Sequence, residues 1–541
     1  MKAFSAKGKR VLVVDDFEGF RLAIARKLEE QGNIRADTTH SGEEALKLCR
    51  NRYYDAILTD FNLGAGKTGL QVLEALRFHN ELEPKQVFML ISAENNKQIV
   101  LAATDVEPDA YIAKPITTHN LGSRLARIFK QRKELNKLYE YLGKDNTGAA
   151  IDACRQHIEH HGYYAPFCEK VLGELLIQLG DLPTAKSHYE SILLQRPLDW
   201  ARLGLANVLV ELREYDDAEE NLKSIINENP FVMKAYDQLH QVYDSKQDLY
   251  CKQEIMEKAV AVSPLSFARQ KCLAETALGN KNYLVAAGAY KKIMRLGRNS
   301  VYHQPEQIVD YARTAAVLTT EDPEAGLAFC KDAQVWFGQK NKNANSSDSL
   351  QNQMVSVQLL SGLGEHAKAL NIFSDVELNV SKIGEDLPFE CEVDYVFTLK
   401  SIEKLESAEK YLISLCSKYQ DEEKKLEILD QLLAEPVSHK NKAIVAAMNR
   451  RGIAQYEQKN YSDAATLFLR ARKLFPKHLG INLNLVQVLY EEMKSHGMRS
   501  DYMLEVEASL NAVRAVIQVG DQQYQRFACL EAEFKDMKSK M

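Results

Sequence analysis

The sequence predicts two kinds of structure in one chain: a doubly wound α/β domain at the N-terminus, followed by an all-α superhelix of paired helices. In the first 130 residues, short apolar runs typical of buried strands alternate with helical segments, and four of these runs end directly on polar side chains. Beyond Thr117 the pattern is helical almost without interruption and repeats with a period near 34 residues. The chain has 541 residues, so several domains are expected.

The predicted strands of the α/β part place chemistry at their C-terminal ends. The runs and the polar residues that follow them are Arg10–Val14 with Asp15 and Asp16, Ala56–Thr59 with Asp60, Leu90–Ile91 with Ser92, and Tyr111–Ala113 with Lys114. The carboxyl ends of parallel strands meet at one edge of a sheet, which is where open α/β folds place their sites. We therefore expect three carboxylates, a hydroxyl and an ammonium group to lie together.

Three adjacent carboxylates repel one another unless a cation lies between them, and Mg²⁺ prefers oxygen ligands. The cluster therefore predicts a magnesium site. With the metal bound, Asp60 can act as a nucleophile toward a phosphoryl group, while Lys114 neutralises charge on the transferred oxygens. Ser92 is expected to donate a hydrogen bond to one of those oxygens. The pattern favours aspartyl-phosphate chemistry.

With these residues in this order, the segment from about residue 8 to 130 resembles a response-regulator receiver domain, which has the CheY-like (flavodoxin-like) fold. The resemblance implies that a sensor histidine kinase phosphorylates Asp60, and that Ser92 and Tyr111 form a switch pair that changes the surface of the fourth and fifth helices. It also implies the Mg²⁺ ligands, which are Asp15, Asp16, Asp60 and the backbone carbonyl of Asn62. Lys114 would contact the phosphoryl group and precede a cis Pro115.

The loop after Asp60 differs from the family pattern. It lacks the usual proline, and Gly69 follows nine residues after Asp60 instead of eight, so the loop is longer. The resemblance also places Asn62 and Glu94 beside the path by which water attacks the phosphoryl group. Polar side chains there predict a short-lived phosphoryl state, although both residues are equally well explained as solvated loop positions.

Composition places the protein among globular chains, with 45% hydrophobic and 27% charged residues and a formal net charge of −6. No apolar run approaches the roughly 18 residues of a membrane span, and no secretory signal is evident at the start. The nine cysteines are dispersed without metal-binding or disulfide spacing, so reduced core thiols are expected. These features predict a cytoplasmic protein, and the receiver resemblance predicts a bacterial one.

From about Pro166 the chain resembles a tetratricopeptide-repeat (TPR) array. Pro197, Pro230 and Pro264 mark the period, with small and large residues recurring at the positions where paired helices pack. The expected organisation is a receiver over 1–130, a linker helix and helical lead-in over 131–165, and TPR repeats over 166–298. A degenerate repeat with a polar loop at 338–349 then occupies 299–349, and a second TPR segment with a capping helix at 522–538 completes 350–541.

The TPR resemblance also implies a partner groove lined by fixed positions of each first helix. The candidates that we single out are Lys170, Trp200, Asn207 and Lys234. A carboxylate clamp for chaperone tails is disfavoured, because Glu174 and Gly204 stand where that clamp needs asparagine. The groove positions are equally compatible with packing against other parts of the chain itself.

Two other features carry alternative readings. A basic helix over 121–141 could contact nucleic acid, but a solvated linker face is the more common meaning of such a pattern. His157 and His161 have metal-binding spacing on a helix, but no third ligand is indicated nearby.

Together these features predict a two-component response regulator whose output is phosphorylation-dependent protein–protein interaction of the TPR array. The array could bind an effector or act back on the kinase. The alternative is a receiver-controlled nucleic-acid-binding repeat protein, which the acidic net charge makes unlikely. No catalytic motif that would act on a separate substrate molecule occurs after Lys114. We therefore expect no enzymatic activity other than self-catalysed phosphoryl transfer to Asp60 and autodephosphorylation. Membrane insertion is not expected, and the sequence leaves the oligomeric state, the kinase and the TPR ligand open.

Overall fold

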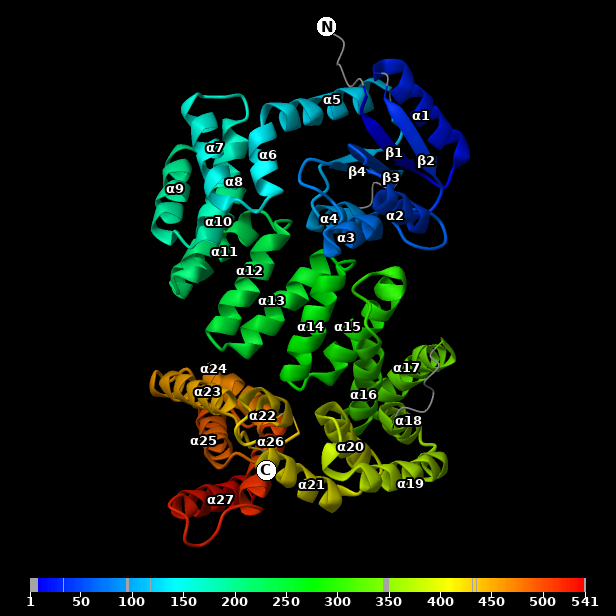
Figure 1. Cartoon of the computed structure of the whole chain (residues 1–541). Coiled ribbons are helices and arrows are strands. Elements are labelled where there is room, and N and C mark those ends of the chain that lie inside the picture. The colour runs from blue at the N-terminus through cyan, green and yellow to red at the C-terminus, as the bar shows by residue number, and fades with distance from the viewer. Residues whose placement is uncertain are drawn as a thin grey trace. The chain divides into compact units, whose positions relative to one another are not determined.

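The computed structural model describes residues 8–32, 34–93, 97–116, 118–343, 350–430, 432–433 and 435–539. The chain forms two compact units (Figure 1). The first extends to Lys246 and also includes 251–273 and 292–304; the second includes 247–250, 274–291 and the chain from Pro305 onward. The predicted fold class is confirmed, since a parallel α/β sheet domain precedes a long all-helical region.

The N-terminal domain is built on a five-stranded parallel sheet in the order β2-β1-β3-β4-β5. The strands are β1 (Arg10–Val14), β2 (Arg35–Thr39), β3 (Ala56–Asp60), β4 (Val87–Ser92) and β5 (Ala110–Ala113). Every residue of β3 and β4 is buried, as expected for central strands covered on both faces. The strand order reverses between β1 and β3, so the site lies at the topological switch point of the sheet.

Helices cover both faces of this sheet (Figure 1). On one face, α1 (Glu18–Gly32) and α5 (Thr118–Glu134) form an apolar cluster with alternate residues of β1, β3 and β4. On the other face, α2 (Gly42–Asn51), α3 (Gly69–Phe78) and α4 (Lys97–Asp105) pack on the remaining alternate residues. Strands β1, β3 and β4 thus contribute to both cores, which explains why these strands appear in the sequence as continuous apolar runs.

Helix α3 begins with a capping box. The Thr68 hydroxyl accepts a hydrogen bond from the Gln71 N–H at 3.2 Å, and the Gln71 side-chain oxygen accepts one from the Thr68 N–H at 3.0 Å. We expect Thr68→Ala to cost about 1 kcal/mol and to speed amide exchange in α3 about fivefold, measured by hydrogen exchange on the full chain. Thr104→Ala is the control, because that hydroxyl bonds back only to carbonyl groups of its own helix. Equal protection of α3 in wild type and Thr68→Ala would contradict the expectation.

The prediction of one continuous helix over 121–141 is wrong. Helix α5 ends at Glu134, and α6 (Asn136–Leu142) begins after Leu135, whose backbone departs from helical geometry. Leu135 and Leu138 are buried in the apolar cluster of the helices that follow. Tertiary packing of these leucines therefore bends the chain where local pattern alone favours a continuous helix.

Antiparallel helix pairs make up the rest of the first unit, and their residues 247–250 and 274–291 belong to the second unit. The helices are α7 (Thr147–Glu159), α8 (Ala165–Leu179), α9 (Leu182–Gln195), α10 (Asp199–Glu211), α11 (Tyr215–Glu228), α12 (Met233–Ser245), α13 (Leu249–Val262), α14 (Phe267–Gly279) and α15 (Tyr283–Leu296), followed by the 3-10 turn η1 (Gly297–Asn299). The Tyr189 ring packs against Gly173 and Gly204, where an added Cβ would lie 2.4 Å and 2.2 Å from ring atoms. Gly204, which argued against a chaperone clamp, thus makes room for Tyr189.

The second unit continues the paired pattern. Its further helices are α16 (Pro305–Glu321), α17 (Pro323–Asn343), α18 (Leu350–Gly362), α19 (His366–Ile383), α20 (Phe389–Ser401), α21 (Leu405–Lys418), α22 (Glu423–Leu429), α23 (His439–Glu457), α24 (Tyr461–Leu474), α25 (Leu479–His496), α26 (Ser500–Arg514) and α27 (Tyr524–Ser539), with a 3-10 turn η2 (Gly384–Asp386). The expected polar loop at 338–349 is wrong over its first half, because α17 extends to Asn343; residues 344–349 lie outside the described part of the chain. Helix α17 begins at Pro323, and its buried Phe337 lies just before this stretch.

The C-terminal helix α27 covers the end of the second unit. Phe527, Leu530 and Phe534 join the last apolar cluster, and the Tyr490 hydroxyl donates to the Leu530 carbonyl at 2.8 Å. All nine cysteines are free thiols. Within the described residues, no helix combines the length and the apolar character that a membrane crossing requires.

Candidate functional site

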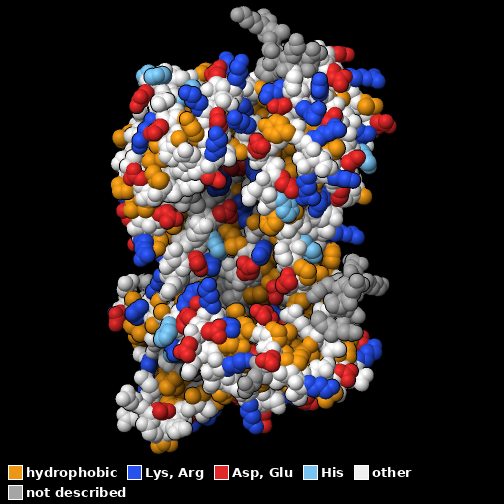
Figure 2. Space-filling view, in the orientation of Figure 1, with side chains coloured by type: hydrophobic (Ala, Val, Ile, Leu, Met, Phe, Trp, Pro, Cys, Tyr) orange, Lys and Arg blue, Asp and Glu red, His pale blue; other side chains and the backbone are white. Residues whose placement is uncertain are grey.

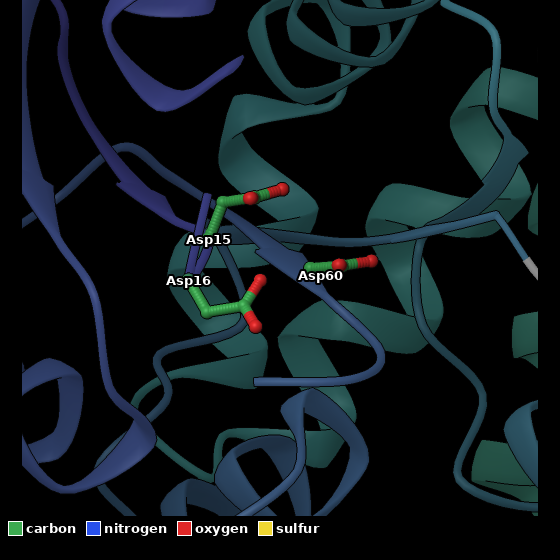
Figure 3. Close-up of side chains that lie close together, drawn as sticks. All are labelled: Asp15, Asp16 and Asp60. Atoms are coloured by element: carbon green, nitrogen blue, oxygen red, sulfur yellow. The ribbon is translucent and has the colours of Figure 1, made fainter. Parts of the chain in front are cut away.

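The predicted carboxylates meet at the C-terminal edge of the sheet (Figure 3). Asp15 and Asp16 follow β1, and Asp60 is the last residue of β3, its neighbour in the sheet. Each carboxylate offers an oxygen, and these oxygens lie within 4.8 Å of one another. Asp15 and Asp60 are buried whereas Asp16 is exposed, so the cluster opens to solvent on one side.

Lys114 completes the cluster from the loop after β5. Its ammonium group lies 2.8 Å from Asp15 Oδ2 and 3.0 Å from Asp60 Oδ2. The same nitrogen lies 4.3 Å from the centre of the Phe20 ring, in cation–π range. The Lys114–Pro115 peptide bond is cis. Lys114 thus stands where it can neutralise charge that develops on oxygens bound to Asp60.

Burial and the charge of Lys114 shift the pKa of Asp60 in opposite directions. Desolvation raises the pKa of Asp60, and the neighbouring Asp15 adds to the rise, while the hydrogen bond from Lys114 opposes it. Burial would lower the pKa of Lys114, but its contacts with Asp15 and Asp60 outweigh burial and raise it. The lysine is therefore held in its charged form beside carboxylates that are costly to leave unpaired.

The donor set suits a hard divalent cation. Octahedral Mg²⁺ at about 2.1 Å from its ligands needs oxygens roughly 3 to 4 Å apart. One oxygen from each of Asp15, Asp16 and Asp60 lies within 4.8 Å of the other two. Among the residues that the structure describes, this is the one group of three or more His, Cys, Asp or Glu side chains with such spacing. His157 and His161 are not part of any such group.

The two residues predicted to form a switch pair lie on the neighbouring strands. Ser92 is buried at the end of β4, beside Asp60 on β3, and its carbonyl accepts from the Lys114 N–H at 2.7 Å. Tyr111 is half-buried in β5, and its carbonyl accepts from Arg124 of α5 at 2.9 Å. The structure therefore brings Ser92 to the cluster, while Tyr111 lies further down β5.

The loop after Asp60 is shaped by its glycines. The Asn62 side-chain oxygen accepts from the Gly64 N–H at 3.1 Å, so this side chain is bonded within its own loop. At Gly69 a Cβ would lie 2.1 Å from the Asp60 carbonyl oxygen, which permits only glycine where α3 begins against β3. Glu94 lies outside the described residues.

Sequence reasoning missed two residues that hold Asp15. The Arg21 guanidinium donates to the Asp15 carbonyl at 2.6 Å, and the Phe17 N–H donates to Asp15 Oδ1 at 2.9 Å. The signal for Arg21 was its place at the start of α1, close after the acid pair.

The predicted groove residues have different surroundings. Lys234, on α12, pairs with Glu107 at 2.5 Å, and Lys170, on α8, lies one turn from Glu174 with their charged atoms 3.8 Å apart. The Trp200 ring packs edge-on against Tyr189, with centroids 6.4 Å apart, so it belongs in part to the helical core. Asn207 is half-buried on α10.

Three basic residues of the helix predicted as an alternative nucleic-acid contact are bonded within the protein. Arg124 bonds the Tyr111 carbonyl, Arg132 pairs with Asp109, and Lys130 lies 3.7 Å from Glu134. On the face shown in Figure 2, acidic and basic side chains are interspersed and form no broad basic field. Neither observation favours a nucleic-acid surface.

Comparison with known proteins agrees with this geometry. The model of the response regulator receiver domain family matches residues 11–126, and a tetratricopeptide repeat model matches residues 427–491. The chemotaxis protein CheY-3 of Vibrio cholerae is 30% identical over 131 residues, which are 24% of this chain and 99% of CheY-3. CheY of Pseudomonas aeruginosa is 29% identical over 23% of this chain and 97% of its own length. A solved structure of the response regulator TrrA from Thermotoga maritima is 28% identical, covers 22% of this chain and 98% of that one, and has a TM-score of 0.21.

Fold and site together define a receiver protein, with an acid cluster and a lysine at the switch point of a doubly wound sheet. The chain belongs to the response-regulator receiver family through its N-terminal domain, and a TPR-containing helical region follows that domain.

Proposed function

We propose that the protein is a two-component response regulator in which a sensor histidine kinase phosphorylates Asp60, and that the phosphoryl state controls protein binding by the TPR array. The observation that carries this proposal is the convergence of Asp15, Asp16 and Asp60 with the Lys114 ammonium group on one open edge of the sheet. A carboxylate, its cation and a candidate metal site are the parts that phosphoryl transfer to aspartate needs.

In the transfer step, an oxygen of Asp60 forms a bond to phosphorus while the bond from phosphorus to the kinase histidine nitrogen breaks. The electron pair of that bond stays on the imidazole, which takes up a proton. Lys114 and the Ser92 hydroxyl bind the phosphoryl oxygens. Asp15 and Asp16, with the Asn62 carbonyl, would hold Mg²⁺, which when bound neutralises charge on the transferred group. Water attack on phosphorus then breaks the bond to Asp60 and releases inorganic phosphate.

The output of this proposal is a protein interaction. The helical region supplies paired helices of the TPR kind, which bind peptides and proteins rather than small substrates. We propose no catalysis toward an outside substrate, only self-catalysed phosphoryl transfer and autodephosphorylation.

The test is to map the phosphoryl group. The full chain is treated with acetyl phosphate and Mg²⁺, the acyl phosphate is trapped by borohydride reduction, and peptides are analysed by mass spectrometry. We expect the trapped group on Asp60, and chelation of Mg²⁺ before treatment should reduce the trapped fraction at least about tenfold, because the clustered carboxylates lose the cation between them. A trapped group on another residue would refute the assignment.

A further inference from the structure

The receiver contacts helices of the first repeat segment within the same compact unit. On the receiver, the contacts come from the loop between β3 and α3, from α3, and from α4 with the turn that follows it. We call this surface the docking face and define it by Gly66, Lys67, Gln71, Lys97, Asp105 and Glu107. These residues meet residues of the same unit, which are Phe231, Lys234, Arg269, Leu296 and Asn299.

A desolvated ion pair lies at one end of α4. The Asp105 carboxylate is 2.5 Å from Arg269 Nη1 of α14, and the two side chains are only 15% and 7% exposed. Arg269 also donates to both carboxylate oxygens of Asp237 on α12, at 2.8 and 2.7 Å. Such charge-assisted bonds away from solvent are stronger than surface pairs. Arg269 therefore joins the receiver to two helices of the array.

Of the lysines predicted for the partner groove, Lys234 contacts the receiver and Lys170 lies near enough for its charge to act on it. Glu107 pairs with Lys234 at 2.5 Å. Burial acts to raise the pKa of Glu107, but the ion pair with Lys234 and the charge of nearby Lys170 lower it overall. At the other end of α4, the Lys97 ammonium lies 3.5 Å from the centre of the Phe231 ring. One acidic residue of the receiver, Glu107, thus pairs with a predicted groove residue of the array, Lys234.

The extended loop after the phosphoacceptor makes a third contact. The Asn299 side-chain amide donates to the Gly66 carbonyl at 2.6 Å, and the Lys67 ammonium donates to the Asn299 carbonyl. The Gln71 amide donates to the Leu296 carbonyl at 3.3 Å. Gly66 lies four residues after Asn62, which helps to form the candidate metal site. The lengthened loop therefore contacts the array in addition to α3 and α4.

Apolar contacts reinforce this end of the docking face. Val301 packs against the receiver's own apolar cluster, and the Tyr302 ring stands edge-on to Phe78 with centroids 5.7 Å apart. Desolvation raises the pKa of Glu74 on α3 to about 7. Burial raises the pKa of Tyr302 as well, and the charge of Glu74 adds to that rise.

We propose that the unphosphorylated receiver is an internal ligand of the first TPR segment, bound through Asp105 and Glu107, and that phosphorylation of Asp60 weakens this docking. The second half rests on the proposed function. Phosphorylation replaces the single negative charge of the Asp60 carboxylate with about −1.5 to −2 on the phosphoryl oxygens, beside the loop that Asn299 holds. If the site rearranges around the phosphoryl group, the loop moves and its hydrogen bonds to Asn299 change. Helix α4 follows Ser92 in the chain and is bound to the array at both ends, so a movement of Ser92 also strains those contacts.

The docking is tested with Asp105→Asn in the full chain. Arg269 keeps Asp237 as its partner in this variant, so the array is not left with an unpaired buried cation. We expect amide exchange in α4 and in the first part of α14 to become about tenfold faster, while α10 and α11 stay unchanged. The control is Glu30→Gln, which removes an exposed acid on α1. Unchanged exchange in Asp105→Asn would overturn the docking.

The coupling is tested by adding Mg²⁺ and beryllofluoride to wild type and to Asp60→Ala. Faster exchange in α4 and α14 of wild type alone supports the proposal. If beryllofluoride protects the site but leaves α4 and α14 unchanged, the coupling is refuted while the proposed phosphoacceptor stands. If beryllofluoride does not protect the site in wild type, the proposed function fails and the coupling with it, whereas the Asp105→Asn result still decides the docking.

Discussion

Asp60→Asn is expected to abolish phosphoryl incorporation from acetyl phosphate, with a loss of at least about 10³-fold in rate, because the carboxamide is not a nucleophile. The measurement is the trapped phosphoryl group per chain as a function of time. The fold should be retained. Lys114 keeps its 2.8 Å contact with Asp15, and one of two buried carboxylates that repel each other becomes neutral.

The matched controls separate the nucleophile from its surroundings. Asp152→Asn removes an exposed acid on α7 and should leave incorporation unchanged. Asp16→Asn retains the nucleophile but removes one candidate metal ligand, so incorporation should fall and recover in part at higher Mg²⁺ concentration. Incorporation at the wild-type rate in Asp60→Asn would show that another residue accepts the phosphoryl group.

Gly69→Ala is expected to destabilise the receiver by about 3 kcal/mol or more, which corresponds to roughly 150-fold faster exchange of amides in β3 and α3. The added Cβ would lie 2.1 Å from the Asp60 carbonyl oxygen and 2.8 Å from Thr59 Oγ1. Both atoms belong to a fully buried strand that cannot move without disturbing both cores of the sheet. Since Asp60 is at the point of collision, phosphoryl incorporation should also fall.

Gly148→Ala provides the comparison for this prediction. Nothing lies within 4 Å of a Cβ at Gly148, in the first turn of α7. The substitution should therefore stabilise that helix by about 0.5 to 1 kcal/mol, because alanine loses less backbone entropy on folding. Amide exchange at the wild-type rate throughout β3 and α3 of Gly69→Ala would contradict the prediction. It would mean that the end of β3 moves to accommodate the added Cβ at little cost in stability.

Much of the candidate site could be predicted from the sequence, because the end of a buried strand is marked by the point where an apolar run stops at a polar residue. Apolar runs that stop at Asp15, Asp60, Ser92 and Lys114 place these residues on one edge once the sheet is parallel, and the strands are buried on both faces as such runs require. Lys114 lies within hydrogen-bond distance of two of the acids it was expected to join.

Other features depended on side chains that approach from distant parts of the chain. Local pattern did not reveal the bend at Leu135, because that bend depends on burial of Leu135 and Leu138 in a core formed by later helices. Helix α17 likewise continues to Asn343 through polar residues that resemble a loop. In both places tertiary packing overrides local propensity.

The sequence by itself determined the receiver fold, the acid cluster and the repeated helix pairs, since each depends on a regular spacing of apolar and polar residues along the chain. Only the tertiary structure decided which residues lie next to Lys170 and Lys234, and which part of the chain the loop after Asp60 contacts. Asp105 and Arg269 are 164 positions apart, and Gly66 and Asn299 are 233 apart, so no local pattern relates them. Contacts of this kind depend on how separately folded elements pack, and periodicity within one element carries no information about its distant partner.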